Sequence, residues 1–355
     1  MNHVTHNFSA GPARLPPAVL ERLSAALAPQ EQPSIVEASH RGQRFMAVAE
    51  ELHERVRRCA GIDEEHAVLL LHGGASLQFV QLPLNLAANR PAAFLITGHW
   101  GKKALEAART IGKAVVAGSS EADGFTRLAE VEQIPHNCAY LHYTGNESIH
   151  GVQFDRPPQA DVPLVADMSS EFLSRPYPYS DVDVAYAGAQ KNLGIAGLTV
   201  VLMRRDLLER IPDELSPYLD YRSWADNLSL FNTPAVLAWV AALEMLRWME
   251  DQGGLEAIGE RNQKRAARLY AAIDATGFWH NPVAAQCRSV MNIPFWPTDE
   301  RLTARFLAEA EQNGLIGLKG HRSAGGLRAS LYNAQTCDAV NTLIAFMQHF
   351  EERYG

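Results

Sequence analysis

Hydrophobic positions along the first half of the chain alternate between two spacings. Short apolar runs, each long enough for one strand, occupy residues 67–71, 92–96, 113–117, 139–142 and 164–167. Helical segments beginning near Ser76 and Trp100 follow the first two runs. This alternation predicts an α/β fold with a mostly parallel sheet that helices cover on both faces.

Longer helical patterns flank this region. Pro16 and Pro17 open one helix, and a second apolar stripe begins at Phe45 and ends at Gly61. Two more helices are predicted at residues 234–252 and 255–275. The polar connection 204–232 before them is longer than a compact domain needs, unless it reaches a neighbouring molecule or covers a site.

The pattern changes after Cys287. Strand-like runs at 289–294 and 326–332 alternate with helical segments at 302–312 and 338–350, which predicts a smaller C-terminal α+β domain. The expected division is an N-terminal extended segment 1–15, a large domain 16–260 and a small C-terminal domain 261–355.

Composition narrows the function classes. The 355 residues are 47% hydrophobic and 20% charged, with a formal net charge of -8, which argues against nucleic acids and anionic membranes as partners. The sequence contains neither a secretory signal pattern nor an apolar run of membrane-spanning length, so we expect a cytoplasmic protein. Four scattered cysteines without CxxC spacing suit reduced thiols, and no metal site is predicted.

Candidate ligand-binding residues follow the predicted strands, where parallel sheets bind ligands. The glycine-rich turn at 73–76 could bind a phosphate through backbone N–H groups, or its glycines could be a steric necessity. Trp100 could stack on a planar ring or belong to the core. Asp167, at the end of its strand, could face a ligand or cap the next turn.

Lys191 lies among small residues, between Gly188 and Gly194. Most lysines are surface residues, but small neighbours would let a bulky aldehyde such as pyridoxal phosphate reach the amine and form a Schiff base. Such an enzyme needs an acidic partner for the pyridine nitrogen, and Asp167 precedes the lysine at a strand end. A second cluster of cations lies in the glycine-rich segment 319–328, which suggests anion binding.

Together these motifs resemble the phosphoserine aminotransferases, a family of class V pyridoxal phosphate-dependent aminotransferases. The resemblance extends over the whole chain and rests on NFSAGPA at 7–13, EASHRG at 37–42, HGGASLQF at 72–79, YTGNESIHG at 143–151, ADMSS at 166–170, FNTP at 231–234 and the segments 186–197 and 317–334. It implies fold type I, a pyridoxal 5'-phosphate cofactor and a homodimer with shared active sites.

The resemblance also implies a role for each site residue. Lys191 would bind the cofactor covalently, Asp167 would pair with the pyridinium nitrogen, and Trp100 would stack on the ring. The remaining cofactor contacts would come from Ala75, Ser76, Ser148 and Gln190, and from the partner chain's copies of Asn232 and Thr233. The substrate contacts would come from Arg328 for the α-carboxylate, from His40, Arg41, His321 and Arg322 for the phosphate or the glutamate side chain, and from Ser9, whose neighbour Ala10 replaces a serine of some members. His321 and Arg322 would come from the partner chain.

The implied reaction is ping-pong transamination from glutamate to phosphohydroxypyruvate, with 4-phosphohydroxythreonine as an open second substrate. Two alternatives stay open at this point. A class V relative could act on serine, alanine or cysteine without a phosphate, although neither Cys287 nor Cys337 lies in an evident mobile loop, as a desulfurase would need. A non-catalytic phosphate-binding protein could use the same glycine turn, but it would not need Lys191 beside Asp167.

Overall fold

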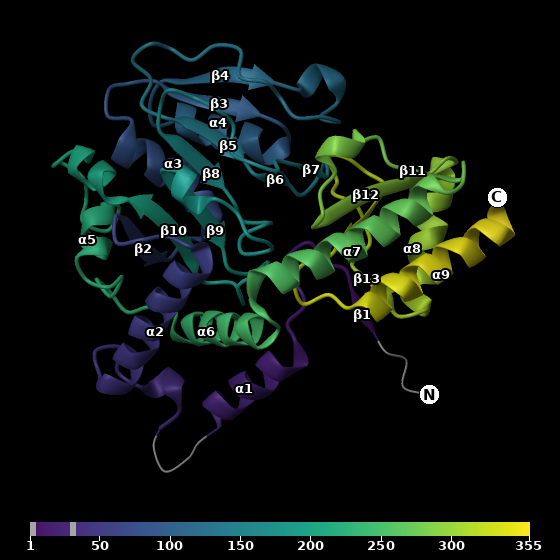
Figure 1. Ribbon diagram of the computed structural model, residues 1–355, viewed down its shortest axis with the longest axis horizontal. Helices are drawn as coiled ribbons and strands as arrows, with labels where there is room; N and C mark the ends of the chain where they lie inside the picture. Colours follow the sequence, from purple (N-terminus) through teal and green to yellow (C-terminus); the bar gives the residue numbers. More distant parts are fainter. Residues whose placement is uncertain (1–4, 29–32) are drawn as a thin grey trace.

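The computed structural model describes residues 5–28 and 33–355. Residues 1–4 of the expected N-terminal segment therefore lie outside the described residues. The chain folds around a seven-stranded sheet, with a second group of elements built from the C-terminal residues beside it (Figure 1).

The large sheet has the strand order β2-β10-β9-β8-β5-β3-β4. Its strands are β2 His66–Leu71, β3 Ala92–Ile96, β4 Ala114–Ser119, β5 Leu141–Thr144, β8 Leu164–Asp167, β9 Val184–Gly188 and β10 Thr199–Arg204. Only β10 runs antiparallel to its neighbours, and the pairs from β9 to β4 are parallel. The predicted, mostly parallel sheet is thus confirmed, and parallel pairing brings several strand ends to one edge.

Alternate residues of the strands enter two separate cores. In β2, Val68 and Leu70 pack in one hydrophobic cluster, whereas Leu69 and Leu71 pack in the other. Since successive side chains of a strand point to opposite faces, both faces of the sheet are buried. This explains why the predicted strands read as continuous apolar runs rather than as an alternating pattern.

Helices cover each face. The nine α-helices among the described residues are α1 Pro17–Leu27, α2 Gln43–Ala60, α3 Gly74–Leu86, α4 His99–Arg109, α5 Tyr221–Ala225, α6 Val236–Asp251, α7 Gly254–Asp274, α8 Thr303–Gln312 and α9 Cys337–Tyr354. Helices α1, α2 and α6 pack on one face of the sheet and α3, α4 and α5 on the other. These layers, seen in Figure 1, confirm the predicted α/β architecture.

The C-terminal part has its own core and sheet. Strands β11 Trp279–His280, β12 Asn292–Pro297 and β14 Leu327–Ser330 form an antiparallel sheet that packs with α7, α8 and α9. Strand β1 His6–Asn7 pairs in parallel with β13 Leu315–Ile316, so the N-terminal segment joins this part. The division at residues 15 and 260 stays a prediction, and α7 runs across the second position without a break.

The connection 204–232 is more structured than its polar sequence suggested. It contains a 3-10 helix at Arg205–Arg210 and the short helix α5, whose Tyr221 and Trp224 are buried. These aromatic side chains pack in the same cluster as α3 and α4, so most of the connection covers the sheet. Periodicity did not reveal this because the helices are too short to repeat a pattern.

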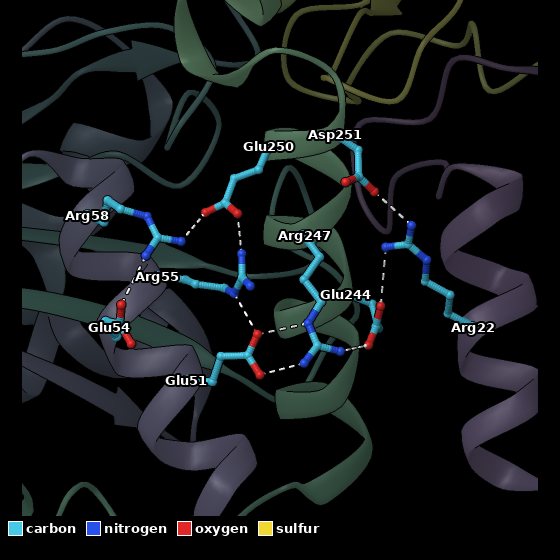
Figure 2. Close-up of polar contacts among 9 residues, drawn as sticks. All are labelled: Arg22, Glu51, Glu54, Arg55, Arg58, Glu244, Arg247, Glu250 and Asp251. Atoms are coloured by element: carbon cyan, nitrogen blue, oxygen red, sulfur yellow. Dashed lines mark hydrogen bonds and ion pairs between the residues drawn. The ribbon is translucent and has the colours of Figure 1, made fainter.

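Ion pairs join α1, α2 and α6, the helices on the face of the sheet opposite α3, α4 and α5 (Figure 2). Arg247 of α6 contacts Glu51 of α2 and Glu244 of its own helix, with nitrogen–oxygen distances of 2.9 and 2.7 Å. Arg22 of α1 also reaches Glu244, at 3.4 Å. This network ties α1, α2 and α6 together.

The structure also bears on membrane association. Within residues 5–28 and 33–355, no helix is both long enough and apolar enough to cross a bilayer.

Candidate active site

A cavity of about 510 Å³ opens at the carboxyl ends of β5 and β8. Its walls come from the N-terminal segment, the start of α3, the ends of these strands, the turn after β9 and the C-terminal part. The lining includes Ala10, Gly11, Pro12, Gly74, Ala75, Ser76, Phe79, Trp100, Thr144, Asn146, Ser148, Ile149, Asp167, Ser169, Ser170, Gln190, Lys191, Ala196, His321 and Arg328. Segments far apart in the sequence therefore meet at one edge of the sheet, as the strand-end rule predicts.

Lys191 lies in the turn that follows β9 and lines this cavity. Burial lowers the pKa of its ammonium, while the nearby Asp167 raises it and Arg328 lowers it. The next residue, Asn192, is buried and accepts a hydrogen bond of 3.0 Å from the backbone N–H of Asn333. The turn is thus tied to the C-terminal part, and a neutral amine suited to attack a carbonyl is favoured.

The small residues around Lys191 have a structural reason that the sequence did not reveal. Gly194 has a φ of 150°, and a Cβ there would lie 3.2 Å from the backbone nitrogen of Ala242 in α6. Glycine therefore permits close contact between the turn and α6. On the other side, a Cβ at Gly11 would lie 3.7 Å from Cγ of Lys191, so the N-terminal segment is close to the lysine.

Asp167 is the last residue of β8, and its pairing partner on β9 is Tyr186. Its Oδ1 accepts a hydrogen bond of 2.9 Å from the backbone N–H of Ser169, and the residue lines the cavity. Burial raises the pKa of its carboxyl, while Lys191 and the Ser169 hydrogen bonds lower it. Asp167 therefore caps the turn and also faces the cavity, so the two readings of the sequence are compatible.

Trp100 and Ser148 lie together at the cavity. The indole Nε1–H of Trp100 donates a hydrogen bond of 3.1 Å to Oγ of Ser148. The amine of Lys191 lies 5.8 Å from the centroid of the Trp100 ring. An aromatic face next to an amine and a carboxylate suits a flat, charged heterocycle.

The glycine turn after β2 leads into α3, and the first residues of this helix lie at the cavity. Gly73 and Gly74 have φ values of 88° and 70°, and Gly74, Ala75 and Ser76 line the cavity. In the part of the chain that the structure describes, no side chain caps this end of α3. Its free N–H groups and helix dipole are available to an anion, and Gln190 lines the same cavity.

Two of the predicted substrate-binding side chains reach the cavity within one chain. Arg328 donates a hydrogen bond of 3.0 Å from Nη1 to the backbone oxygen of Ser148, and it lines the cavity together with His321. In the single chain, His321 lies at the cavity of its own chain, and the expectation that the partner chain supplies His321 stays a prediction. The loop before β14 bends back to the cavity of its own chain through a hydrogen bond from Gly320 N–H to the oxygen of Gly326.

The other predicted site residues lie outside this cavity in the single chain. Arg41 and Arg322 are exposed, and His40 and Ser9 are partly buried. Ser9 packs beside Gly317, where a Cβ would lie 2.5 Å from its Oγ. Asn232 and Thr233 line a separate depression with His72, whose Nε2 lies 3.1 Å from Oδ1 of Asn232.

Sequence reasoning assigned no role to two buried residues, one that lines the cavity and one that contacts the start of α4. Thr144 ends β5 and lines the cavity, and its Oγ1 is buried with no hydrogen-bond partner among the described residues. Glu147 is fully buried and accepts hydrogen bonds from the backbone N–H groups of Trp100 and Gly101. The position of Thr144 at a strand end could have identified it from the sequence. Glu147 is identified only by its tertiary contact with the start of α4.

Known proteins similar to this chain agree with the chemistry of the cavity. The family model of the class-V aminotransferases matches residues 5–343. The chain belongs to the class-V aminotransferases. This aminotransferase is 46% identical to a phosphoserine aminotransferase of Azotobacter vinelandii over 361 aligned positions, with 100% of both chains covered. It is 45% identical to the Geobacillus kaustophilus phosphoserine aminotransferase, with 99% of both chains covered.

Solved structures agree with the aminotransferase assignment. The phosphoserine aminotransferase of Bacillus circulans subsp. alkalophilus superposes with a TM-score of 0.96 at 43% identity, with 99% of both chains covered. A pyridoxal phosphate-bound phosphoserine aminotransferase of Trichomonas vaginalis gives 0.91 at 36% identity, covering 97% of this chain and 100% of that one. The expected family, fold type I and pyridoxal phosphate cofactor are thereby confirmed.

The cavity of this aminotransferase fits pyridoxal phosphate. The uncapped start of α3 suits the phosphate group, and Lys191 is a partly buried amine near a buried carboxylate. The unpartnered hydroxyl of Thr144 leaves one polar group available to a ligand. The enzyme is therefore a pyridoxal phosphate-dependent transaminase whose cavity has the polar groups that this cofactor needs.

Proposed function

We propose that this aminotransferase catalyses the reversible transfer of the amino group from L-glutamate to 3-phosphohydroxypyruvate, giving O-phospho-L-serine and 2-oxoglutarate, a step of serine biosynthesis. The observation that carries the proposal is that Arg328 and His321 line the same cavity as Lys191 and Asp167. The Arg328 guanidinium can bind one anionic group, and the His321 imidazole can donate a hydrogen bond to a second, which suits a substrate with two anionic groups. The curated relatives with the same full-length alignment carry this enzyme's name.

The residues that would hold the cofactor are distributed around the cavity. Ala75, Ser76 and Gln190 would contact its phosphate, Trp100 its ring face and Ser148 its edge. Asp167 would keep a proton on the pyridine nitrogen. Pyridoxal phosphate, when bound, supplies an electron sink for the electron pair left when the substrate loses its Cα proton.

The substrate is bound and deprotonated by the chain's own groups. Arg328 would bind the α-carboxylate through its guanidinium, with its other contact to the Ser148 oxygen holding it in place. His321 would contact the second anionic group. His40, Arg41 and Arg322 lie outside this cavity in the single chain and would contact the same group where a second copy completes the site. Burial favours the neutral form of the Lys191 amine, which would take the proton from the Cα of glutamate and, in the second half of the reaction, give a proton to the Cα of the new amino acid.

The half-reaction with O-phosphoserine tests this proposal. Wild-type enzyme mixed with O-phosphoserine, without an acceptor, is expected to change its cofactor absorption at least about a hundredfold faster per molar substrate than with plain serine. The reason is that serine would lose two charge-assisted contacts, each worth roughly 1.5–3 kcal/mol. Stopped-flow absorption measures both rates, and equal rates for the two donors would exclude a phosphate-specific enzyme.

The same assay extends to a second substrate. We propose that 4-phosphohydroxythreonine, which carries the same α-carboxylate and a phosphate, also reacts, which would place the enzyme in pyridoxine biosynthesis as well. No spectral change with this donor, under conditions where O-phosphoserine reacts, would limit the enzyme to serine biosynthesis.

We also propose a cytoplasmic location, because the four cysteines are free thiols. Cell fractionation would check this location.

A homodimer with shared sites is a further part of the proposal. Asn232 and Thr233 line a depression of their own and are not among the residues that line the Lys191 cavity of the same chain. We propose that they complete the site of a second copy, where they would contact the cofactor phosphate. The adjoining connection 204–232 would serve both to cover the sheet and to present these two residues.

Mixing two inactive variants tests the shared site. Lys191→Ala subunits and Asn232→Ala/Thr233→Ala subunits, unfolded and refolded together, are expected to regain part of the wild-type activity. In such a mixed dimer one site contains both defects and the other contains neither. If each variant refolded alone and the mixture were equally inactive, the two residues would act within their own chain.

A desulfurase is disfavoured by the placement of the thiols. Cys287 is buried, which raises the pKa of its thiol, and Cys337 is exposed at the start of α9. Neither residue lines the cavity that contains Lys191. A nucleophilic thiolate for sulfur transfer would have to approach the substrate there.

A further inference from the structure

The loop between β5 and β8 brings a glutamate to the start of α4. Glu147 belongs to the two-residue strand β6 Asn146–Glu147 and is fully buried. Its Oε2 accepts from the backbone N–H of Trp100 at 3.1 Å, and its Oε1 accepts from that of Gly101 at 2.8 Å. One carboxylate therefore binds two free N–H groups in the first turn of the helix, where the dipole also favours negative charge.

A side chain at Gly98 would collide with this carboxylate, whereas one at Gly101 would make ordinary van der Waals contact with it. A Cβ at Gly98 would lie 2.5 Å from Cδ of Glu147, and one at Gly101 would lie 3.5 Å from its Oε1. The segment 98–101 is thus packed directly against the glutamate. An adjacent residue contacts the other end of the same tryptophan, because Ser148 Oγ accepts the indole N–H.

These contacts hold Trp100 at both ends. The backbone of the tryptophan is bound by Glu147 and its ring nitrogen by Ser148, while its ring lies 5.8 Å from the Lys191 amine. We propose that Glu147 is a positioning residue, whose buried carboxylate fixes the start of α4 and thereby the plane of the Trp100 ring over the cofactor. The inference rests on the proposed role of Trp100 in stacking on the cofactor.

The surroundings of Glu147 both oppose and favour its charged form. Burial raises the pKa of Glu147 to about 7, with Asp167 adding to the rise, while the two N–H groups and Lys191 lower it. A buried carboxylate without hydrogen-bond donors would be costly. The two hydrogen bonds from the start of α4 therefore stabilise the carboxylate, and the carboxylate in turn holds the start of the helix. A glutamine would keep the size but would present an N–H₂ group to one of the two backbone donors.

Cofactor binding to the apoenzyme provides the first test. Glu147→Gln is expected to raise the Kd for pyridoxal phosphate about tenfold, which is the scale of one hydrogen bond to a charged group. It should also reduce the induced visible circular dichroism of the bound cofactor, a signal that depends on ring orientation. Gly98→Ala, which displaces the same carboxylate without changing it, should have both effects in the same direction.

A matched control and a double variant complete the test. Glu244 is a buried glutamate of α6 in the ion-pair network of Figure 2, and Glu244→Gln should leave the Kd and the dichroism at the wild-type values. Trp100→Phe combined with Glu147→Gln should bind the cofactor no more weakly than Trp100→Phe alone, because both changes act through one ring. Additive losses, or a Glu147→Gln enzyme that matches Glu244→Gln, would overturn the inference.

The two proposals fail in different ways. An unchanged dichroism in Trp100→Phe would remove the proposed role of the tryptophan itself. A changed signal in Trp100→Phe with an unchanged signal in Glu147→Gln would leave that role intact and exclude the positioning role of Glu147. Thermal unfolding of each apoprotein identifies a variant that fails to fold. If Glu147→Gln fails to fold, the Kd and the dichroism of Gly98→Ala test the positioning role of Glu147 instead.

Discussion

Replacing Lys191 with alanine is expected to abolish transamination, with kcat lowered at least about a thousandfold. One amine is proposed both to bind the cofactor covalently and to move the substrate proton, and general acid–base catalysis alone contributes about 10²–10⁴-fold. The amine lines the cavity, and burial lowers its pKa. Steady-state assay of O-phosphoserine formation from glutamate measures the loss.

A covalent readout separates chemistry from folding in this variant. Borohydride reduction should attach the cofactor permanently to the peptide that contains Lys191 in the wild type and leave the Lys191→Ala protein unlabelled. Lys264→Ala, a change to an exposed lysine of α7 that pairs with Glu260, should behave like the wild type in both assays. Undiminished turnover in a folded Lys191→Ala protein would end the assignment of the lysine.

Replacing Asp167 with asparagine is expected to lower kcat/KM on the order of 10²–10³-fold, the scale for loss of one preorganised electrostatic partner. The carboxylate would keep a proton on the pyridine nitrogen, and an amide carries no charge to stabilise that proton. The hydrogen bond from Ser169 N–H to Oδ1 can be retained by asparagine, so the turn should stay folded. Steady-state kinetics and the cofactor absorption spectrum measure the effect.

The same substitution should change the titration of Lys191. Asp167 raises the pKa of the lysine, so its loss should lower that pKa further below 10.5 and expose a reactive amine at lower pH. Pulse acylation of the apoprotein over a pH series, quantified by mass spectrometry, locates the transition. Asp183→Asn changes a carboxylate at the opposite end of β8, where Oδ2 accepts from Leu164 N–H, and should leave both measurements unchanged. An upward shift of the Lys191 transition in Asp167→Asn would contradict the proposed pairing.

The sequence by itself determined the strands and several of the site residues. Apolar runs marked β3 and β8 at their observed bounds, because strands buried on both faces need continuous apolar residues. Asp167 follows directly from this pattern, since the end of a parallel strand places its residue at the ligand edge. Lys191 was singled out by its small neighbours, which are a local feature of the chain, and the family motif then gave it a role.

Tertiary structure decided the features that depend on contacts between distant segments. Glu147 and Trp100 are 47 positions apart, and no local pattern indicates that a carboxylate would meet the start of α4. The position of His321 at the cavity of the single chain also depends on how the loop before β14 packs. Local periodicity encodes which face of an element is buried, but the partner of a buried polar group is fixed only when the elements pack, because it is that packing that removes the group from water.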